Sequence, residues 1–377
     1  MPESTIARDA DRLAYRDPQR ARALARRLEA LVAEIGRERV CVMHVCGTHE
    51  QAIAKFGLRA VLPRALDVIM GPGCPVCVTD LPEVDEAVTL AQDGKRVATY
   101  GDMVRVPGTT LSLADAAALG ARVDVVYSAA QAVALARATR DEVVFFASGF
   151  ETTAVTTAAV ALADVPPNFS ILSAHKYIPP AMEVVARLPE TRIEAFLAAG
   201  HAATITGWGI FEPFVARHRI PVVVAGFEPL DILAALVQAA RLIRDGRPEV
   251  ANMYPRCVTR EGNRNAQTRL WRVFETASGR WRGIADVPGG NLRLRDAFAR
   301  LDARRRYRID TGPLRAAASR RRTEACICGR ILSGVATPAD CPLFGTACVP
   351  ERPVGACMVS TEGACRIWHQ YGGRAEL

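Results

Sequence analysis

The stretch Gly71-Pro72-Gly73-Cys74-Pro75-Val76-Cys77 decides how the rest of the chain is interpreted. It follows a short apolar run, residues 67–70, that is typical of a buried strand, and its glycines and prolines fix the backbone in a turn. Its two cysteines are close enough to form a disulfide or share a metal. A Cys-x-x-Cys loop after a strand in an α/β pattern indicates redox or metal chemistry. The alternative interpretation is a structural zinc site or a pair of inert buried thiols.

A second cysteine loop lies earlier in the chain. The expected strand 40–45 ends in Cys46-Gly47-Thr48-His49-Glu50, so we expect Cys46 to face the pair Cys74 and Cys77, with His49 nearby. Soft thiolates together with an imidazole suit iron or zinc. The same pair can also cycle between dithiol and disulfide. The two loops therefore predict a metal-binding thiol site with redox capacity.

From residue 40 to about residue 245, short apolar segments alternate with helical ones, which is typical of βαβ units and parallel sheets. A helix precedes them, capped by Asp17 and closed by Gly36. We predict an α/β fold with two parallel-sheet α/β domains rather than one large one. Strands are expected at 40–45, 67–70, 96–100, 123–127, 143–147, 170–173, 193–197 and 221–225, and helices at 81–92, 129–138, 152–163 and 230–243.

Unusual residues follow several of these strands. Ligands bind at the carboxyl ends of strands in open α/β sheets, so we expect these loops to line one crevice. Besides the two cysteine loops, they are Gly101-Asp102, Ser148-Gly149-Phe150-Glu151-Thr152-Thr153, Ala174-His175-Lys176, Gly200-His201 and Gly226-Phe227-Glu228-Pro229.

The alternation fades after about residue 245. We expect a helix at 265–276, a short extended piece at 281–284, and a solvated Arg-rich linking helix at 302–322. The predicted domains are an N-terminal helix with a first α/β domain at 1–125, a second α/β domain at 126–250, and a Cys-rich C-terminal iron–sulfur domain at 251–377.

The C-terminal segment carries six cysteines among Gly and Pro residues, with little apolar periodicity. A metal or cluster normally stabilises such a segment. Cys326, Cys341, Cys348 and Cys365 are separated by 14, 6 and 16 residues. Four thiolates can hold zinc or a four-iron cluster, and these wide spacings favour the cluster. Cys328 and Cys357 are either substitutes or bystanders.

Composition restricts the class of protein. The 377 residues carry a net charge of +8 and eleven cysteines. We find no signal peptide and no apolar run of transmembrane length, so we expect a cytoplasmic protein without membrane insertion. A disulfide scaffold is not expected in that compartment. The basic clusters at 304–306 and 320–322 lack interleaved aromatic residues, so an acidic protein partner explains the charge better than nucleic acid does.

Taken together, these motifs resemble those of the HypD family of hydrogenase formation proteins. The resemblance rests on both cysteine loops, on Phe150-Glu151-Thr152-Thr153, on the spacing of the four C-terminal cysteines, on residues 341–345 and on the run from Cys357 to Cys365. It extends from about residue 40 to residue 371. In one place the chain departs from the family, since a motif similar to Pro-Gly-His-Val-Ser is replaced by Ala199-Gly200-His201-Ala202-Ala203.

The resemblance implies a redox-active scaffold rather than a turnover enzyme. Such a scaffold assembles an iron carrying two cyanides and one carbon monoxide, the Fe(CN)2CO group of [NiFe]-hydrogenases. The implied partners are a HypC-type chaperone and HypE, which supplies cyanide and is itself charged by HypF. The implied site residues are Cys46, His49, Cys74 and Cys77 for iron and redox chemistry, Cys326, Cys341, Cys348 and Cys365 for a [4Fe-4S] cluster, and Glu362 in the cluster-proximal motif.

Two other functions remain open from the sequence. One is a stand-alone thiol/disulfide oxidoreductase that depends on an iron–sulfur cluster, which requires Cys74 and Cys77 but not Cys46. The other is a zinc-stabilised binding protein without redox chemistry, which the iron content of the purified protein distinguishes from the first two.

Overall fold

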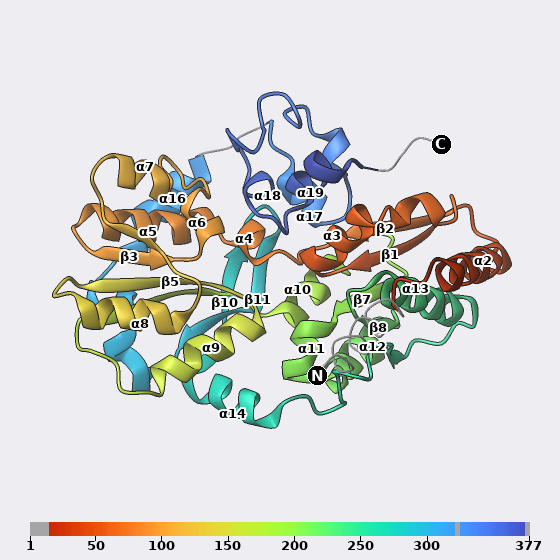
Figure 1. The fold of residues 1–377 in the computed structure, drawn as a ribbon, viewed down its shortest axis with the longest axis horizontal. Coiled ribbons are helices and arrows are strands. Elements are labelled where there is room, and N and C mark those ends of the chain that lie inside the picture. Colours follow the sequence, from red (N-terminus) through yellow and green to blue (C-terminus); the bar gives the residue numbers. More distant parts are fainter. Residues whose placement is uncertain (1–14, 321–324, 374–377) are drawn as a thin grey trace, which may run out of the picture.

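The computed structural model describes residues 15–320 and 325–373. It contains two parallel sheets, which lie beside each other with the C-terminal segment above the region between them (Figure 1). The predicted α/β class with parallel sheets is therefore confirmed. Within the described residues, no helix is both long enough and apolar enough to cross a lipid bilayer.

The five-stranded sheet is built from two distant parts of the chain. Its first two strands pair with each other, and the first also pairs with a strand about 150 residues later through the register Val42↔Ala195. All its neighbouring strands are parallel. Its order is β2 (Leu66–Met70), β1 (Val40–His44), β7 (Ala195–Ala199), β8 (Val222–Ala225) and β9 (Val250–Asn252).

The four-stranded sheet is built from the continuous segment between these parts. Its order is β4 (Val123–Val125), β3 (Arg96–Thr99), β5 (Val143–Gly149) and β6 (Phe169–His175). The expected domain boundary at residue 125 consequently falls inside this sheet, because β3 pairs with strands on both sides of it. Local apolar patterns located the strands, but they carry no information on which distant strands pair.

Helices cover both sheets. The predicted first helix is confirmed as α2 (Pro18–Ile35): Asp17 accepts hydrogen bonds from the backbone N–H of Gln19 and Arg20, and Gly36 closes the helix with φ 69°. It packs against α13 (Pro229–Arg244) beside the five-stranded sheet. The other helices before residue 230 are α3 (Gly47–Lys55), α4 (Pro75–Val78), α5 (Leu81–Gln92), α6 (Gly101–Val104), α7 (Leu113–Ala118), α8 (Ala129–Ala138), α9 (Glu151–Ala161), α10 (Ile178–Val185), α11 (Gly200–Thr206) and α12 (Glu212–His218).

A β-hairpin between the two sheets was not expected from the sequence. Helix α14 (Arg264–Val273) ends where β10 (Phe274–Trp281) begins, and β11 (Ala285–Leu294) returns antiparallel to it. The prediction of a helix to residue 276 and a short extended piece at 281–284 is therefore wrong. The pattern was hidden because β10 has no regular alternation of apolar and polar residues, and a register shift interrupts the pairing near Ala277 and Gly279.

The first part of the Arg-rich segment is docked rather than solvated, whereas Arg315 in its second part is exposed. Helix α15 (Ala303–Arg306) lies against β6, where Arg304 donates a 2.7 Å hydrogen bond to Glu86 and Arg306 donates to the carbonyl of Pro167. Helix α16 (Thr311–Arg320) follows, and residues 321–322 of the second basic cluster lie outside the described residues. The C-terminal segment then forms α17 (Cys328–Leu332), α18 (Ala356–Val359) and α19 (Ala364–Tyr371).

Candidate metal and redox site

The two cysteine loops meet at the carboxyl ends of β1 and β2. These strands are direct neighbours in the sheet, and the backbone N–H of Gly47 donates a 3.0 Å hydrogen bond to the carbonyl of Gly73. A Cβ atom at Gly73 would lie 2.0 Å from the backbone nitrogen of Cys46, so only glycine permits this approach. The structure thus brings Cys46 to the Cys74–Cys77 loop, as the sequence predicted.

Cys74 and Cys77 form a disulfide with a Cα–Cα separation of 5.3 Å. Both residues are fully buried. The bond spans the start of α4, where the backbone N–H of Cys77 also donates to Sγ of Cys74 at 3.1 Å. The first turn of α4 therefore holds the two cysteines at the separation of a disulfide. The reduced pair of thiols can occupy the same positions.

Cys46 is a buried thiol with a histidine beside it. Burial, followed by the nearby carboxyl group of Glu362, raises the pKa of Cys46 to about 12. Its Sγ lies 3.9 Å from Nδ1 of His201, whose pKa burial lowers to about 4. Cys46 is consequently a protonated thiol at neutral pH, until a metal ion displaces the proton. His201 belongs to the motif that departs from the family pattern, and the structure places it in contact with this thiol.

His49 points away from the thiols toward the end of β8. Its Nε2 donates to the carbonyls of Ala225 and Gly226 at 3.4 and 3.0 Å, and its ring lies 5.0 Å from the ring of Phe227. Burial, helped by His44 and His201, lowers the pKa of His49 to about 3. The side chain therefore fixes the start of α3 to β8 as a neutral imidazole, and its role in proton transfer stays a prediction.

A network behind Cys46 was missed from the sequence. His44, the last residue of β1, contacts the carbonyl of Cys46 through Nδ1 at 3.0 Å and Oε2 of Glu50 through Nε2 at 2.9 Å. Glu50 also accepts hydrogen bonds from Arg59 and Trp368. A histidine two residues before the cysteine, at a buried strand position, was the available signal, but nothing in the sequence identified its partners.

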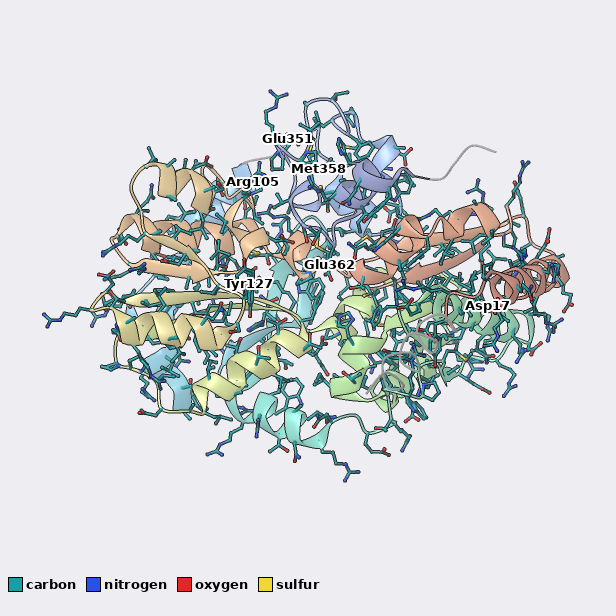
Figure 2. All side chains as sticks on the ribbon, in the orientation of Figure 1. Asp17, Arg105, Tyr127, Glu351, Met358 and Glu362 are labelled. Carbon is teal, nitrogen blue, oxygen red and sulfur yellow. A yellow bond between two sulfur atoms is a disulfide. The ribbon has the colours of Figure 1, made fainter. Side chains whose placement is uncertain are left out.

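Glu362 approaches Cys46 from the C-terminal segment. Oε1 of Glu362 accepts a 2.9 Å hydrogen bond from Oγ1 of Thr48. A Cβ atom added at Gly47 would lie 2.5 Å from the Cβ of Glu362. Burial, with a smaller effect of Asp102, raises the pKa of this carboxyl group. Figure 2 shows Glu362 near the centre of the molecule, at the foot of the C-terminal segment.

Asp102, on the short helix α6 that follows β3, holds the turn that carries Glu362. It accepts hydrogen bonds from Oγ of Ser360 at 3.0 Å and from the backbone N–H of Thr361 at 3.2 Å. Both sheets thereby contribute to the position of Glu362, one through Asp102 and the other through Thr48.

A cavity of about 380 Å³ opens at this meeting point. Five of the expected loops contribute to it, which supports the prediction that they line one crevice. Its wall combines polar and aromatic side chains. It is lined by Thr48, Pro75, Phe150, Thr152, Thr153, His201, Phe227 and Glu362.

Five of the six C-terminal thiols lie close together. Sγ of Cys326 is 3.3 Å from Sγ of Cys328, and hydrogen bonds join Cys357 to Cys328 and Cys365. Hydrogen bonds of Cys365 with Cys328 and, to a lesser extent, with Cys357 lower the pKa of Cys365 to about 6. Burial raises the pKa of Cys348, and the nearby thiols of Cys328 and Cys326 add to this shift.

The remaining C-terminal thiol, Cys341, is buried but makes no contact with another thiol in the described part of the chain. The structure thus gathers three of the four predicted cluster ligands, together with Cys328 and Cys357, which the sequence left unassigned. Across residues 15–320 and 325–373, no three His, Cys, Asp or Glu side chains are arranged to hold a single metal ion. The donor set of neighbouring thiols nevertheless has the composition that iron–sulfur clusters require.

Comparison with known proteins places this geometry in a family. The HypD family model, described as "Hydrogenase formation hypA family", matches residues 19–372. A hydrogenase maturation factor HypD of Rhizobium leguminosarum bv. viciae is 43% identical over 95% of this chain and 94% of its own length. The corresponding factor of Azotobacter vinelandii is 42% identical over 95% and 96%. A putative hydrogenase expression/formation protein of Methanocaldococcus jannaschii is 43% identical over 89% and 92%. The chain therefore belongs to the HypD family of hydrogenase formation proteins.

Proposed function

We propose that this protein is the scaffold on which the Fe(CN)2CO group of [NiFe]-hydrogenases is assembled. In this proposal iron binds Cys46 and at least one thiol of the Cys74–Cys77 pair. A HypC-type chaperone and HypE act on the bound iron, and HypF contributes indirectly by charging HypE. The family assignment supports the general role in hydrogenase maturation, and the site residues support the chemistry.

The observation that carries the proposal is the close approach of Cys46 to the Cys74–Cys77 loop, beside a cavity that Thr48 and Pro75 of the same two loops line. Iron with strong diatomic ligands is electron-rich and favours soft thiolates. Two protein thiolates anchor it and leave positions for cyanide, carbon monoxide and a partner's cysteine. The partner's thiol matters because the finished group must leave, and a closed protein site would not release it.

Reduction of the disulfide is the step that prepares the site. The bond between Cys74 and Cys77 occupies both sulfur atoms, so iron binding requires two electrons and two protons to convert it to two thiols. Cys328 and Cys357 are in contact, and α18, which carries Cys357, packs against α4, which carries Cys77. In the proposed exchange, the thiols of Cys328 and Cys357 become a disulfide as that of Cys74 and Cys77 becomes two thiols.

The C-terminal thiols are also the proposed cluster ligands. Cys326, Cys341, Cys348 and Cys365 would hold a [4Fe-4S] cluster, which when bound stores and transfers single electrons. The protein's own contribution is to bury Cys341, Cys348 and Cys365, to hold the half-buried Cys326 beside Cys328, and to exclude water from Cys357.

The proposal is tested by the substitution Cys46→Ala in protein purified anaerobically with its HypC-type partner. Iron-bound cyanide and carbon monoxide absorb in an otherwise empty infrared window. We expect those bands and hydrogenase maturation to disappear in Cys46→Ala and to persist in Cys257→Ala, because Cys257 is exposed and outside the cavity. Bands and maturation that persist in Cys46→Ala would show that the proposed site is wrong.

A second candidate is the stand-alone oxidoreductase, and the disulfide between Cys74 and Cys77 favours it. Such an enzyme has no need of Cys46. Reduction of the disulfide and iron binding are therefore measured separately in Cys46→Ser. Loss of iron with unchanged disulfide reduction supports the scaffold, whereas unchanged iron content supports the oxidoreductase.

A further inference from the structure

A second, larger cavity reaches two of the C-terminal thiols and is not lined by Cys46. Its volume is about 1180 Å³, and it lies between α5, the β10–β11 hairpin, α16 and the segment that begins α17. Cys326 and Cys328 both line it. No step of the proposed assembly uses this cavity.

Exposure shows which thiols a molecule from solvent meets first. Cys74, Cys77 and Cys357 are fully buried, and the exposed fractions of Cys341, Cys348 and Cys365 are 8, 6 and 4%. Only Cys326 and Cys328 of the C-terminal set are partly exposed. A reductant that enters the large cavity therefore encounters the outer end of the proposed thiol exchange.

Arg282 stands beside these thiols with unused hydrogen-bonding capacity. Its backbone N–H donates to the carbonyl of Val78 at 3.0 Å, and one terminal nitrogen donates to Pro107 at 2.7 Å. Its guanidinium lies close enough to Cys328 and Cys357 to interact with their charge. Its Nε, however, is buried and has no hydrogen-bond partner in the described residues. Because this nitrogen is closed to solvent, the contribution of Arg282 to the cavity is its positive charge.

Two further arginines of the cavity wall are free to bind an anion. Arg280 and Arg315 are exposed, line the cavity and form no ion pair within residues 15–320 and 325–373. Arg293 and Arg304 are already paired, with Glu275 and Glu86.

Two of the four carboxylates that line the cavity are neutralised by ion pairs. Glu83 is bound by Lys176 through two 2.7 Å contacts, and Glu86 by Arg304. Asp80 and Asp286 also line the cavity and form no ion pair in the described residues, although Asp80 lies near enough to Arg282 for their charges to interact. Arg280, Arg282 and Arg315 outnumber these two carboxylates. The available charge in the cavity is therefore positive, and guanidinium groups are suited to carboxylates.

We infer that this cavity is the docking site of a dithiol reductant that carries a carboxylate. The inference rests on the thiol exchange of the proposed function. The external dithiol loses two electrons and two protons to become a disulfide, and the Cys328–Cys357 disulfide gains them to become two thiols. The carboxylate binds the arginines, which brings the dithiol to Cys328.

The test compares a charged and a neutral dithiol on the full chain under anaerobic conditions. Dihydrolipoate carries a carboxylate and dithiothreitol does not. The rate of reduction of the Cys74–Cys77 disulfide is followed by alkylation and mass spectrometry. In the double variant Arg280→Glu/Arg315→Glu, we expect the rate with dihydrolipoate to fall roughly three- to tenfold and the rate with dithiothreitol to stay unchanged.

Matched controls keep the inference falsifiable. Arg269→Glu/Arg272→Glu makes the same change in net charge on exposed positions of α14, away from the cavity, and should leave both rates unchanged. In the unmodified protein, added salt should slow dihydrolipoate only. Equal responses of the two dithiols, or an equal effect of the control variant, would overturn the inference.

The variant Cys328→Ser separates this inference from the proposed function. Loss of reduction by both dithiols supports the thiol exchange, whatever the arginine variants show. Unchanged reduction would mean that electrons do not pass through Cys328, and the exchange and the docking site would both be rejected.

Discussion

The indole nitrogen of Trp368 donates a 2.7 Å hydrogen bond to Oε1 of Glu50, and this bond joins the last helix to the helix that follows Cys46. Glu50 is fully buried. Burial alone would raise its pKa, but the charge of Arg59 and the hydrogen bond from His44 outweigh this and hold the pKa well below its usual range. The buried carboxylate thus depends on each of its donors.

Trp368→Phe keeps an aromatic ring and removes this donor. We expect the free energy of unfolding to fall by about 1.5–3 kcal/mol, because the bond is made to a buried charge. Denaturation in urea measures the change. Trp271→Phe is the matched control, since Trp271 is half-buried and its indole N–H has no hydrogen bond in the described residues. Equal losses in the two variants would contradict the assignment.

Gly73→Ala should separate the two cysteine loops. Its Cβ atom would collide with the backbone of Cys46, so we expect a loss of about 1–3 kcal/mol of stability and a loss of iron binding. The control is Gly101→Ala, which also follows a strand but meets only the side chain of Val125 at 3.6 Å. Metal analysis and urea denaturation give both readouts. Full iron content in Gly73→Ala would show that this close approach is unnecessary.

His175 should make stability depend on acidity. Burial lowers its pKa from 6.5 to about 4, and it contacts Thr157 and the carbonyl of Gly149. The unfolded chain therefore binds a proton that the folded chain does not, and stability rises with pH across this interval. As pH falls from about 6.5 to 4, protonation of His175 in the unfolded chain lowers the free energy of unfolding by at most about 3 kcal/mol.

Urea midpoints between pH 4 and 7.5 measure this dependence. The slope should be smaller in His175→Gln than in the unmodified protein. His369 is exposed, and His369→Gln should leave the slope unchanged. A slope that is the same in all three proteins would refute the role of His175.

Cys341→Ala tests the proposed cluster. Because Cys341 makes no contact with the other thiols in the described structure, only a bound cluster gives it a role as a ligand. We expect loss of visible absorbance, iron and sulfide, together with faster proteolysis of residues 325–371. Cys257→Ala should retain all of these properties. Unchanged iron and sulfide content in Cys341→Ala would remove it from the ligand set.

Local features of the fold were predictable from the sequence because they depend on local physics. The cap at Asp17, the strand at β5 and the helix at α8 follow from capping chemistry and apolar spacing. The partnership of β1 with β7 does not, since it joins segments about 150 residues apart. The β10–β11 hairpin was missed for a different reason. Strand β10 lacks a regular alternation of apolar and polar residues, and a register shift interrupts its pairing with β11.

The same distinction applies to the site. Cys46, Cys74 and Cys77 were identified because they follow strands that the sequence places at one sheet edge. His44 acts through its contact with Glu50, which lies on another element. Asp102 acts through its contact with Thr361, which lies far along the chain. The sequence reveals neither contact. Cys328 was left unassigned because spacing cannot show that its sulfur lies 3.3 Å from that of Cys326.

The interleaved order of the strands has a consequence for biosynthesis. The four-stranded sheet is continuous in sequence, so it has all its strands as soon as β6 leaves the ribosome. Strands β1 and β2 emerge earlier but must wait for β7 and β8, and Glu362 reaches Gly47 only at the end of translation. A nascent chain therefore exposes Cys46, Cys74 and Cys77 without the cavity around them. The proposed iron loading is consequently expected after translation, and a ribosome-stalled chain should not retain the metal.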